Sequence, residues 1–297
     1  MPLEKGDFRM SLLIGVDGGG TGCRVAIAEE NGNVLARASA GPANIATNLQ
    51  KSRDNFLGAI DEAFDTAGIN RAEIANATAV LGLAGANLGD YAAQLLPTLP
   101  FARANIVSDA ETTLVGAIGD QNGCIAAIGT GSVYGRRDEN GFFQIGGWGF
   151  LLGDDGSGAR LGCDFLHITI LAYDGVAPSS LLTREILEQY DNNPSNIVEQ
   201  AKKFTPGEFG RLAPRIIKAA ALGDENAEGL LVHHTDIVRK SIDAVGFNPD
   251  QAFCMHGGLG QVYLARLPET YQKEAHAAKG NALDGAMTLA GLLLAKS

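Results

Sequence analysis

The stretch that decides this fold is Ile14-Gly15-Val16-Asp17-Gly18-Gly19-Gly20-Thr21-Gly22-Cys23-Arg24. It predicts an apolar strand, 12–16, which ends in an aspartate, three glycines and a threonine. A second strand, 24–28, follows, and the turn at Asn31-Gly32 leads into a third strand, 34–38. Because Asn-Gly between alternating strands is a strong hairpin signal, the stretch predicts a hairpin with a glycine-threonine turn at its head.

A similar pattern recurs from Ile125 onward. A strand, 125–128, leads into Gly129-Thr130-Gly131-Ser132 and a second strand, 133–136, and a turn at Asn140-Gly141 follows. Glycines let backbone N–H groups approach phosphate oxygens, and a hydroxyl adds a further donor. One such loop alone is more often a plain hairpin turn. Because the glycine-threonine turn occurs twice, each time between two strands, the sequence favours two loops that hold one phosphate chain between them.

The composition describes a globular chain without a nucleic-acid surface. The chain has 297 residues, 45% of them hydrophobic, and a net charge of −11, which argues against binding nucleic acid. No apolar run is long enough to span a bilayer, so we expect no membrane partner. Met1–Met10 carries charges instead of an apolar signal core, and we expect a cytoplasmic protein.

The cysteines argue against a metal cluster within one chain. Cys23, Cys124, Cys163 and Cys254 lie far apart, and no pair has the spacing of a metal site. Three of them lie in apolar strand contexts, where buried free thiols are common. Free cysteines are typical of proteins in a reducing compartment, which we therefore expect for this chain.

Strands alternate with helices after the first hairpin, which indicates an α/β fold. A helix over 49–67 with Gly68 as its stop precedes strands over 78–84 and 104–107, and a helix from Glu111 follows the second strand. We place the domain boundary at Asp120, which gives a first domain over 1–120 and a second over 121–281. The second is mostly helical, with helices over 158–173, 180–190, 195–202, 207–222 and 224–245. The terminal helix, 282–297, would complete the first domain.

The order of five motifs along the chain carries a resemblance to a known family. The motifs are Asp17-Gly-Gly-Gly-Thr21, Ser108-Asp109-Ala110, Gly129-Thr130-Gly131-Ser132, Gly147-Trp148-Gly149 with Gly153-Asp154-Asp155-Gly156-Ser157, and Gly257-Gly258-Leu259-Gly260. From about residue 12 to 290 the chain resembles the N-acetylglucosamine and glucosamine kinases of the BadF/BadG/BcrA/BcrD ATPase family, within the actin–hexokinase–Hsp70 superfamily. The resemblance implies two ribonuclease-H-like domains, with ATP and an amino sugar in an interdomain cleft. It also leads us to expect a homodimer.

Asp109 is the candidate catalytic base and a sugar contact. It follows a predicted strand and precedes a helix, so its carboxylate would lie at the sheet edge where open α/β folds bind ligands. Phosphoryl transfer to a sugar hydroxyl needs a carboxylate that orients the hydroxyl and accepts its proton. The alternative is a helix N-cap, a position that Ser and Asp fill routinely. The resemblance favours the base.

The resemblance also assigns the nucleotide and metal contacts. Asp17 would hold Mg²⁺ through water, with a turn residue as the alternative. The first loop would bind phosphate through Gly18, Gly19, Gly20 and Thr21, and the second through Thr130, Gly131 and Ser132. At the third loop the purine would lie on the backbone of Gly257, Gly258 and Gly260.

The sugar contacts implied by the resemblance are Asn44, Gly147, Trp148 and Asp154. A carboxylate such as Asp154 can accept hydrogen bonds from two neighbouring sugar hydroxyls. Trp148, the only tryptophan, is equally compatible with a core position, and Asn44 with a turn. Asp155 would bind backbone amides only.

The resemblance implies an ATP- and Mg²⁺-dependent kinase that phosphorylates the 6-hydroxyl of an amino sugar. An alternative from the same family is the ATPase activator of a reductase or dehydratase, which needs paired thiolates for an iron–sulfur cluster shared across a dimer. A third is a sugar sensor without catalysis, which would not need to retain a base. Neither N-acetylglucosamine nor glucosamine is singled out by the sequence.

Overall fold

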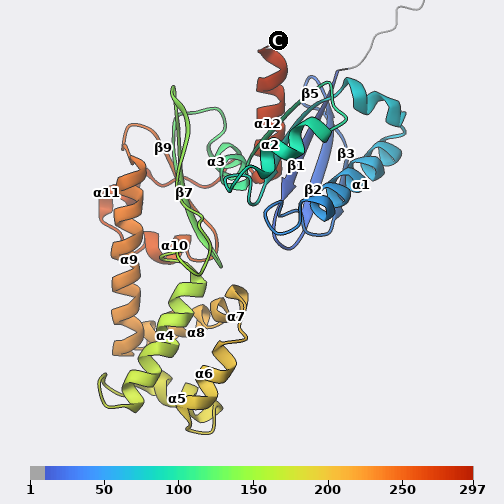
Figure 1. Ribbon diagram of the computed structural model, residues 1–297. Coiled ribbons are helices and arrows are strands. Elements are labelled where there is room, and N and C mark those ends of the chain that lie inside the picture. Colours follow the sequence, from blue (N-terminus) through green and yellow to red (C-terminus); the bar gives the residue numbers. More distant parts are fainter. Residues whose placement is uncertain (1–10, 297) are drawn as a thin grey trace, which may run out of the picture. The chain divides into compact units, whose positions relative to one another are not determined.

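A computed structural model describes residues 11–296 and divides into two compact units (Figure 1). One unit runs to Gln121 and takes in the chain again from Ala278 onward, and the other is Asn122–Ala277. Residues 278–281, which we had assigned to the second domain, therefore group with the first unit. The expectation that Met1–Met10 is no secretion signal lies outside the described residues.

The first unit is built on a five-stranded sheet with the order β3-β2-β1-β4-β5. The first three strands pair antiparallel, as the predicted hairpin requires, and β4 and β5 run parallel to β1. The strands are β1 (Leu12–Gly18), β2 (Cys23–Glu29), β3 (Val34–Ala40), β4 (Thr78–Leu83) and β5 (Arg103–Ser108).

Both faces of this sheet are covered by helices. Alternate residues of β1 point to opposite faces, so that Ile14 packs with Phe56 and Ile60 of α1, whereas Leu13 packs with Ala290 of α12. Strands buried on both faces read as continuous apolar runs, which explains the apolar sequence of β1. The helices of this unit are α1 (Leu49–Ala67), η1 (Arg71–Asn76), α2 (Tyr91–Leu95), η2 (Leu96–Thr98), α3 (Asp109–Ile118) and α12 (Ala282–Ala295).

The second sheet has the order β8-β7-β6-β9 and repeats the first four positions of the first sheet. Its first three strands form antiparallel pairs, and β9 runs parallel to β6. The predicted repetition of the hairpin is confirmed. The strands are β6 (Gly123–Ile128), β7 (Ser132–Asp138), β8 (Gly141–Gly146) and β9 (Ala252–His256).

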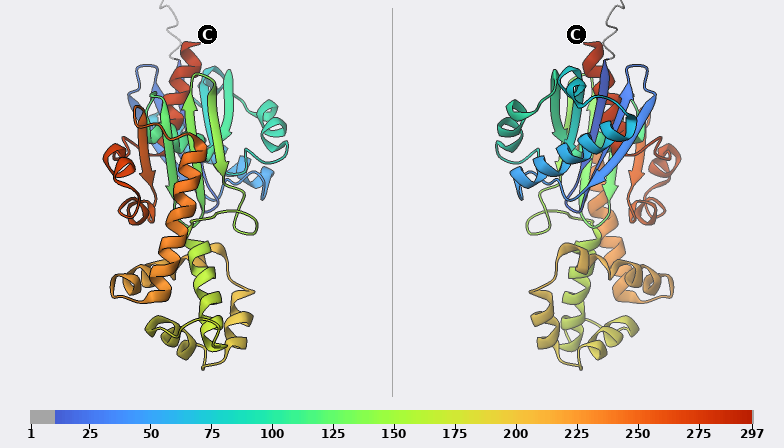
Figure 2. Two further views of the ribbon diagram at one scale, coloured as in Figure 1. Left: turned by 90° about the vertical axis from the view of Figure 1, so that its left-hand side faces the viewer. Right: turned by 90° about the vertical axis from the view of Figure 1, so that its right-hand side faces the viewer.

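The helices of the second unit pack with its strands in one apolar core. In Figure 2 the green and yellow helices α4 to α8 gather beyond one end of the strands, and the orange α9 runs beside the sheet. The helices are α4 (Gly158–Tyr173), α5 (Leu181–Gln189), α6 (Pro194–Ala201), α7 (Pro206–Gly210), α8 (Ala213–Ala221), α9 (Glu225–Val245), α10 (Gly260–Leu264) and α11 (Glu269–Glu274).

The structure corrects two helix boundaries. The single helix predicted over 207–222 is broken into α7 and α8, and Pro214 stands in the first turn of α8. Proline suits a first turn, where its missing N–H costs nothing, but not a helix interior. The helix expected from Glu111 begins at Asp109 instead.

Two glycines let α3 and α12 approach each other backbone to backbone. A Cβ added to Gly285 of α12 would clash with the carbonyl oxygen of Thr112, and one added to Gly116 of α3 would clash with the carbonyl oxygen of Asn281. No side-chain rotation relieves a clash with backbone. The helix that begins with Asp109 is thus held by the last helix of the chain.

We expect Gly285→Ala to lower the free energy of unfolding by at least about 2 kcal/mol, because the added methyl group must push the two helices apart. Gly291→Ala in the same helix is the matched control, since its Cβ would lie 3.9 Å from the nearest atom, on Leu13. The control should be neutral or stabilising by up to about 1 kcal/mol, the difference in helix propensity. Urea denaturation of both variants checks this, and equal effects would contradict it.

Candidate active site

Parallel pairing brings three strand ends of the first unit to one edge of its sheet. Gly18 of β1 pairs with Leu83 of β4, and Leu83 pairs with Ser108 of β5. Asp17 near the end of β1 and Asp109 directly after β5 therefore lie at the same edge, and the two strands are about 10 Å apart, twice the spacing of neighbouring strands. The two carboxylates are 92 positions apart in the chain (109 − 17) and are brought together by the sheet.

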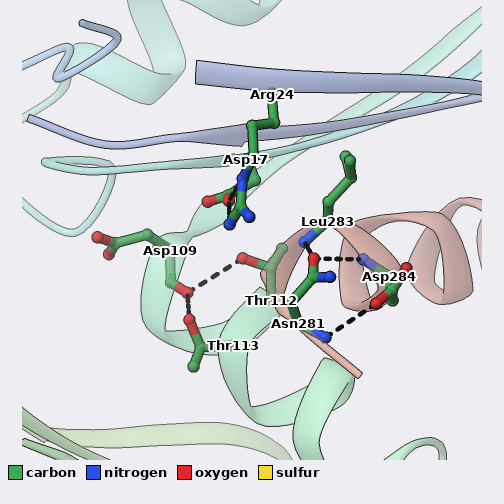
Figure 3. A network of polar contacts seen from close by, with 8 residues as sticks. All are labelled: Asp17, Arg24, Asp109, Thr112, Thr113, Asn281, Leu283 and Asp284. Atoms are coloured by element: carbon green, nitrogen blue, oxygen red, sulfur yellow. Dashed lines mark hydrogen bonds and ion pairs between the residues drawn. The ribbon is translucent and has the colours of Figure 1, made fainter. Parts of the chain in front are cut away.

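Asp109 opens α3 but does not cap it. The side chain of Ser108 accepts the N–H of Glu111 at 3.2 Å, which makes Ser108 the N-cap. The backbone carbonyl of Asp109 accepts the hydroxyls of Thr112 and Thr113, and its carboxylate points away from both (Figure 3). The capping alternative for Asp109 is therefore wrong.

The surroundings of Asp109 disfavour its charged form. Burial raises the pKa of this carboxyl; the N–H of Ala110, 3.0 Å from Oδ1, opposes the rise, and the negative charge of Asp17 adds to it. A carboxylate with a raised pKa is a stronger proton acceptor than an ordinary one, as a general base requires.

Asp17 is paired with an arginine that the sequence reasoning missed. Both Nε, at 3.0 Å, and Nη2 of Arg24 donate to Oδ2 of Asp17. The two residues stand opposite each other in the β1–β2 register, so the predicted hairpin could have identified the pair. Arg24 is half exposed, whereas the side chain of Asp17 is only 14% exposed.

The glycines of the first loop differ in the space that surrounds them. A Cβ on Gly18 would lie 2.6 Å from Leu83 and 2.9 Å from Ala43, so this glycine serves the packing of the loop. Around Gly20 nothing lies within 4 Å of such a Cβ, and Thr21 is exposed. Gly20 and Thr21 are therefore the part of the loop with room for a ligand.

Asn44 lies at the same edge but is used in a turn. Its side-chain oxygen accepts the N–H groups of Ala46 at 3.0 Å and Thr47 at 3.1 Å. The backbone carries the loop to the neighbouring strand end, because Ile45 donates to the carbonyl of Ala84 and Ala84 donates to that of Gly18. The turn role is confirmed, and only the amide nitrogen of Asn44 is left to face a substrate.

In the second unit, two predicted nucleotide loops meet at the end of β6. Gly257 has a φ of +89°, and a Cβ there would clash with the carbonyl oxygen of Ile128, the last residue of β6. That oxygen accepts the N–H of Leu259 at 3.1 Å. The loop 129–132 follows directly, so the two glycine loops lie side by side. Nothing surrounds Gly258 within 4 Å of an added Cβ.

The segment predicted to bind sugar lies on the same part of the second unit. Gly147 donates to the carbonyl of Ser132 at 3.1 Å, and Oδ1 of Asp154 lies 3.5 Å from the N–H nitrogen of Ser132. Trp148 is 63% exposed, so a core position is ruled out for it.

Arg160 of α4 holds this segment and was not found from the sequence. Its Nη2 donates to the carbonyls of Phe150, at 2.9 Å, and Gly153, at 3.3 Å, and its guanidinium lies 5.2 Å from the centre of the Phe150 ring. Phe150 in turn stacks on Phe209 of α7. Arg160 thereby connects both sides of the exposed pair Leu151 and Leu152 to the helical core.

A cavity of about 610 Å³ elsewhere in the second unit contains none of the predicted site residues. Helices α5, α8 and α9 line it with Arg215, Lys218 and Asp224. The carboxylate of Asp224 is already bound by the N–H groups of Leu182 and Ala227. The cavity therefore holds no free carboxylate at Asp224.

Within residues 11–296, no three His, Cys, Asp or Glu side chains gather as a metal site. No helix in the same range combines the length and the apolar character needed to cross a membrane. Three cysteines are buried and Cys163 is partly buried.

The two sheets define the class of protein, an α/β fold of the actin-like kind. A ROK-family glucokinase from Streptomyces griseus shares this fold at a TM-score of 0.51 and 16% identity, with 95% of this chain and 99% of that one covered. Residues 14–279 match the model of the BadF/BadG/BcrA/BcrD ATPase family. The chain belongs to this family.

Its relatives include several kinases of amino sugars. The glucosamine kinase of Vibrio cholerae is 27% identical over 95% of this chain and 96% of its own length. The N-acetyl-D-glucosamine kinase of Dictyostelium discoideum is 28% identical over 82% of both chains. A solved structure from Chromobacterium violaceum, provisionally assigned as an N-acetylglucosamine kinase, has a TM-score of 0.82 at 33% identity, covering 95% of this chain and 99% of that one.

Ser108→Ala and Asp109→Asn should change stability in opposite directions. Loss of the cap at Ser108 should cost about 1 kcal/mol. The pKa of Asp109 is raised in the folded protein, so the folded state holds this proton more tightly than the unfolded state does. The free energy of unfolding therefore falls as pH rises through the raised pKa, and the ionised carboxylate destabilises the fold at neutral pH. Asp109→Asn should therefore raise the thermal midpoint at pH 7. An unchanged midpoint for Asp109→Asn would contradict this and would restore the capping role, because asparagine caps a helix about as well as aspartate.

Proposed function

We propose that this protein is an ATP-dependent kinase that transfers a phosphoryl group to the 6-hydroxyl of an amino sugar, with Asp109 as general base. One observation carries the proposal. Asp109 lies at the carboxyl edge of a parallel sheet, is not used as a helix cap, and has a raised pKa. The names of the related kinases support the substrate class.

Asp109 would accept the proton of the attacking hydroxyl. In phosphoryl transfer the protein contributes mainly by positioning the reactants and stabilising charge. The carboxylate would orient the hydroxyl by accepting its hydrogen bond, and would take the proton as the sugar oxygen bonds to the γ-phosphorus of ATP and the bond from that phosphorus to ADP, the leaving group, breaks. Anchoring of the Asp109 carbonyl by two threonine hydroxyls fixes the first turn of α3, which keeps the base in place.

The glycine loops would bind the nucleotide. Gly20 and Thr21 of the first unit, and Thr130 and Gly131 of the second, offer N–H and hydroxyl donors to phosphate oxygens. The open space around Gly20 and Gly258 suits the close approach of a phosphate chain and of a purine, respectively.

We propose that Asp17 would hold Mg²⁺ through water, because its carboxylate lies at the same edge of the sheet as Asp109 and Mg²⁺ prefers oxygen ligands. Among the described residues only Oδ2 is engaged by Arg24, which leaves Oδ1 for a water of the metal. Mg²⁺ supplies positive charge to the transferring phosphoryl group.

For the sugar, we propose contacts from the amide nitrogen of Asn44, from Asp154 and from the exposed ring of Trp148. A carboxylate and an amide discriminate hydroxyl patterns, whereas an indole face packs on the apolar face of a sugar ring. The acyl state of the 2-amino group is left to measurement.

The activator of a reductase or dehydratase is disfavoured by the cysteines. Burial raises the pKa of Cys124 to about 12 and also raises that of Cys254 and Cys23. Iron–sulfur clusters are held by thiolates, and such buried thiols resist deprotonation.

The proposal is tested by a coupled assay of ADP release with a panel of hexoses and amino sugars. We expect turnover with glucosamine or N-acetylglucosamine and a 6-phosphate product, identified by NMR. Turnover confined to sugars without a 2-amino group would overturn the substrate class, and ATP hydrolysis indifferent to every sugar would overturn the kinase.

Asp109→Asn should lower kcat by about 10²–10⁴-fold, because it removes the base while keeping the size of the side chain. Sugar and nucleotide affinities should change much less. Asp120→Asn, an exposed carboxylate just beyond α3, is the matched control and should retain kcat within about twofold. A near-normal kcat for Asp109→Asn would remove Asp109 from the mechanism.

The pH dependence provides a second readout of the base. The rate should fall as pH falls through the pKa of Asp109, and this limb should lie above the ordinary aspartate value.

A further inference from the structure

The segment 153–158 is hydrogen-bonded to the second glycine loop, 129–132, at several positions. Gly158 donates to the carbonyl of Gly129 at 2.8 Å, and the hydroxyl of Ser132 donates to the carbonyl of Asp155 at 2.7 Å. These bonds hold the backbone around Asp154 against the loop, so its carboxylate can leave the loop only by rotation of the side chain.

The carboxylate of Asp154 consequently lies against the peptide between Gly131 and Ser132. Oδ1 is 3.5 Å from the nitrogen of Ser132, and Oδ2 would be 3.0 Å from a Cβ on Gly131. Burial raises the pKa of Asp154, while the N–H groups of Ser132 and Gly149 and the charge of Arg160 oppose this rise. The carboxylate thus faces the N–H group of Ser132, to which a bound phosphate would also turn.

The backbone at Asp154 is also unusual. Its φ of +59° is one of three positive values outside glycine among residues 11–296. Such a conformation is uncommon for a side-chain-bearing residue and persists where the surroundings enforce it, often at functional sites.

We propose that Asp154 acts as an internal anion on the second glycine loop and keeps nucleotide affinity low until a sugar draws the carboxylate away. Two negative groups a few ångströms apart in a partly buried site repel each other strongly. Sugar hydroxyls that donate to Asp154 disperse its charge and pull it from Ser132. The protein then binds its sugar before its nucleotide, and ATP is not consumed without an acceptor. This inference rests on the proposed function.

The test is calorimetric titration of the whole protein with MgADP in the absence of sugar. Asp154→Asn removes the charge and keeps the shape, and asparagine tolerates a positive φ well. Asp154→Gly removes the whole side chain and favours the same backbone. Both should bind MgADP about tenfold more tightly than the parent, the effect of deleting one nearby negative charge at moderate effective dielectric.

Asp250→Asn is the matched control, because Asp250 is an exposed carboxylate of the same unit, before the opposite end of β9 from the glycine loops. It should leave MgADP affinity within twofold, which excludes a general effect of net charge. Unchanged affinity in both Asp154 variants would overturn the proposal. Weaker affinity in either variant would overturn it as well.

The titration contains no sugar, so its outcome is independent of the substrate. If the parent protein phosphorylates no amino sugar while both Asp154 variants bind MgADP more tightly, the proposed substrate fails and the internal anion stands. If the parent is an amino-sugar kinase and the variants bind MgADP as it does, only the internal anion fails.

Discussion

The parallel register of β1, β4 and β5 is the constraint on which the site of the first unit depends. Because Gly18, Leu83 and Ser108 share one row, the loops that follow these strands all leave from one edge. A slip of one residue would turn every side chain of a strand to the other face and separate Asp17 from Asp109. The backbone bond from Ala84 to Gly18 joins two of these loops and reinforces the register.

The last helix of the chain, α12, supports the edge of the first sheet at which Asp17 and Asp109 lie. α12 packs against β1 and β4 and meets α3 without intervening side chains at Gly116 and Gly285. The proposed role of Asp109 as a base requires that α3 hold this residue within a fraction of an ångström. Contact of backbone with backbone provides such rigidity, because no rotamer change can relax it.

The second unit uses its repeated sheet in a different way. The chain between β8 and α4 folds back onto the glycine loop after β6, and Arg160 from the helix fixes it through two backbone carbonyls. This return places the carboxylate of Asp154 against the glycine loop that follows β6. The loops that follow β1 and β6 therefore differ in what they contact.

Local patterns in the sequence determined the elements and their order. Asn-Gly turns fixed both hairpins, Gly68 ended α1 in the left-handed conformation, and the glycine-threonine repeat identified two related sheets. Only the tertiary structure decided which residue serves which purpose: Ser108 caps α3, Gly18 serves packing, and Trp148 is exposed. The reason is physical, because hairpins and helix ends depend on residues a few positions apart. The space around a glycine and the exposure of a side chain depend on neighbours from distant parts of the chain.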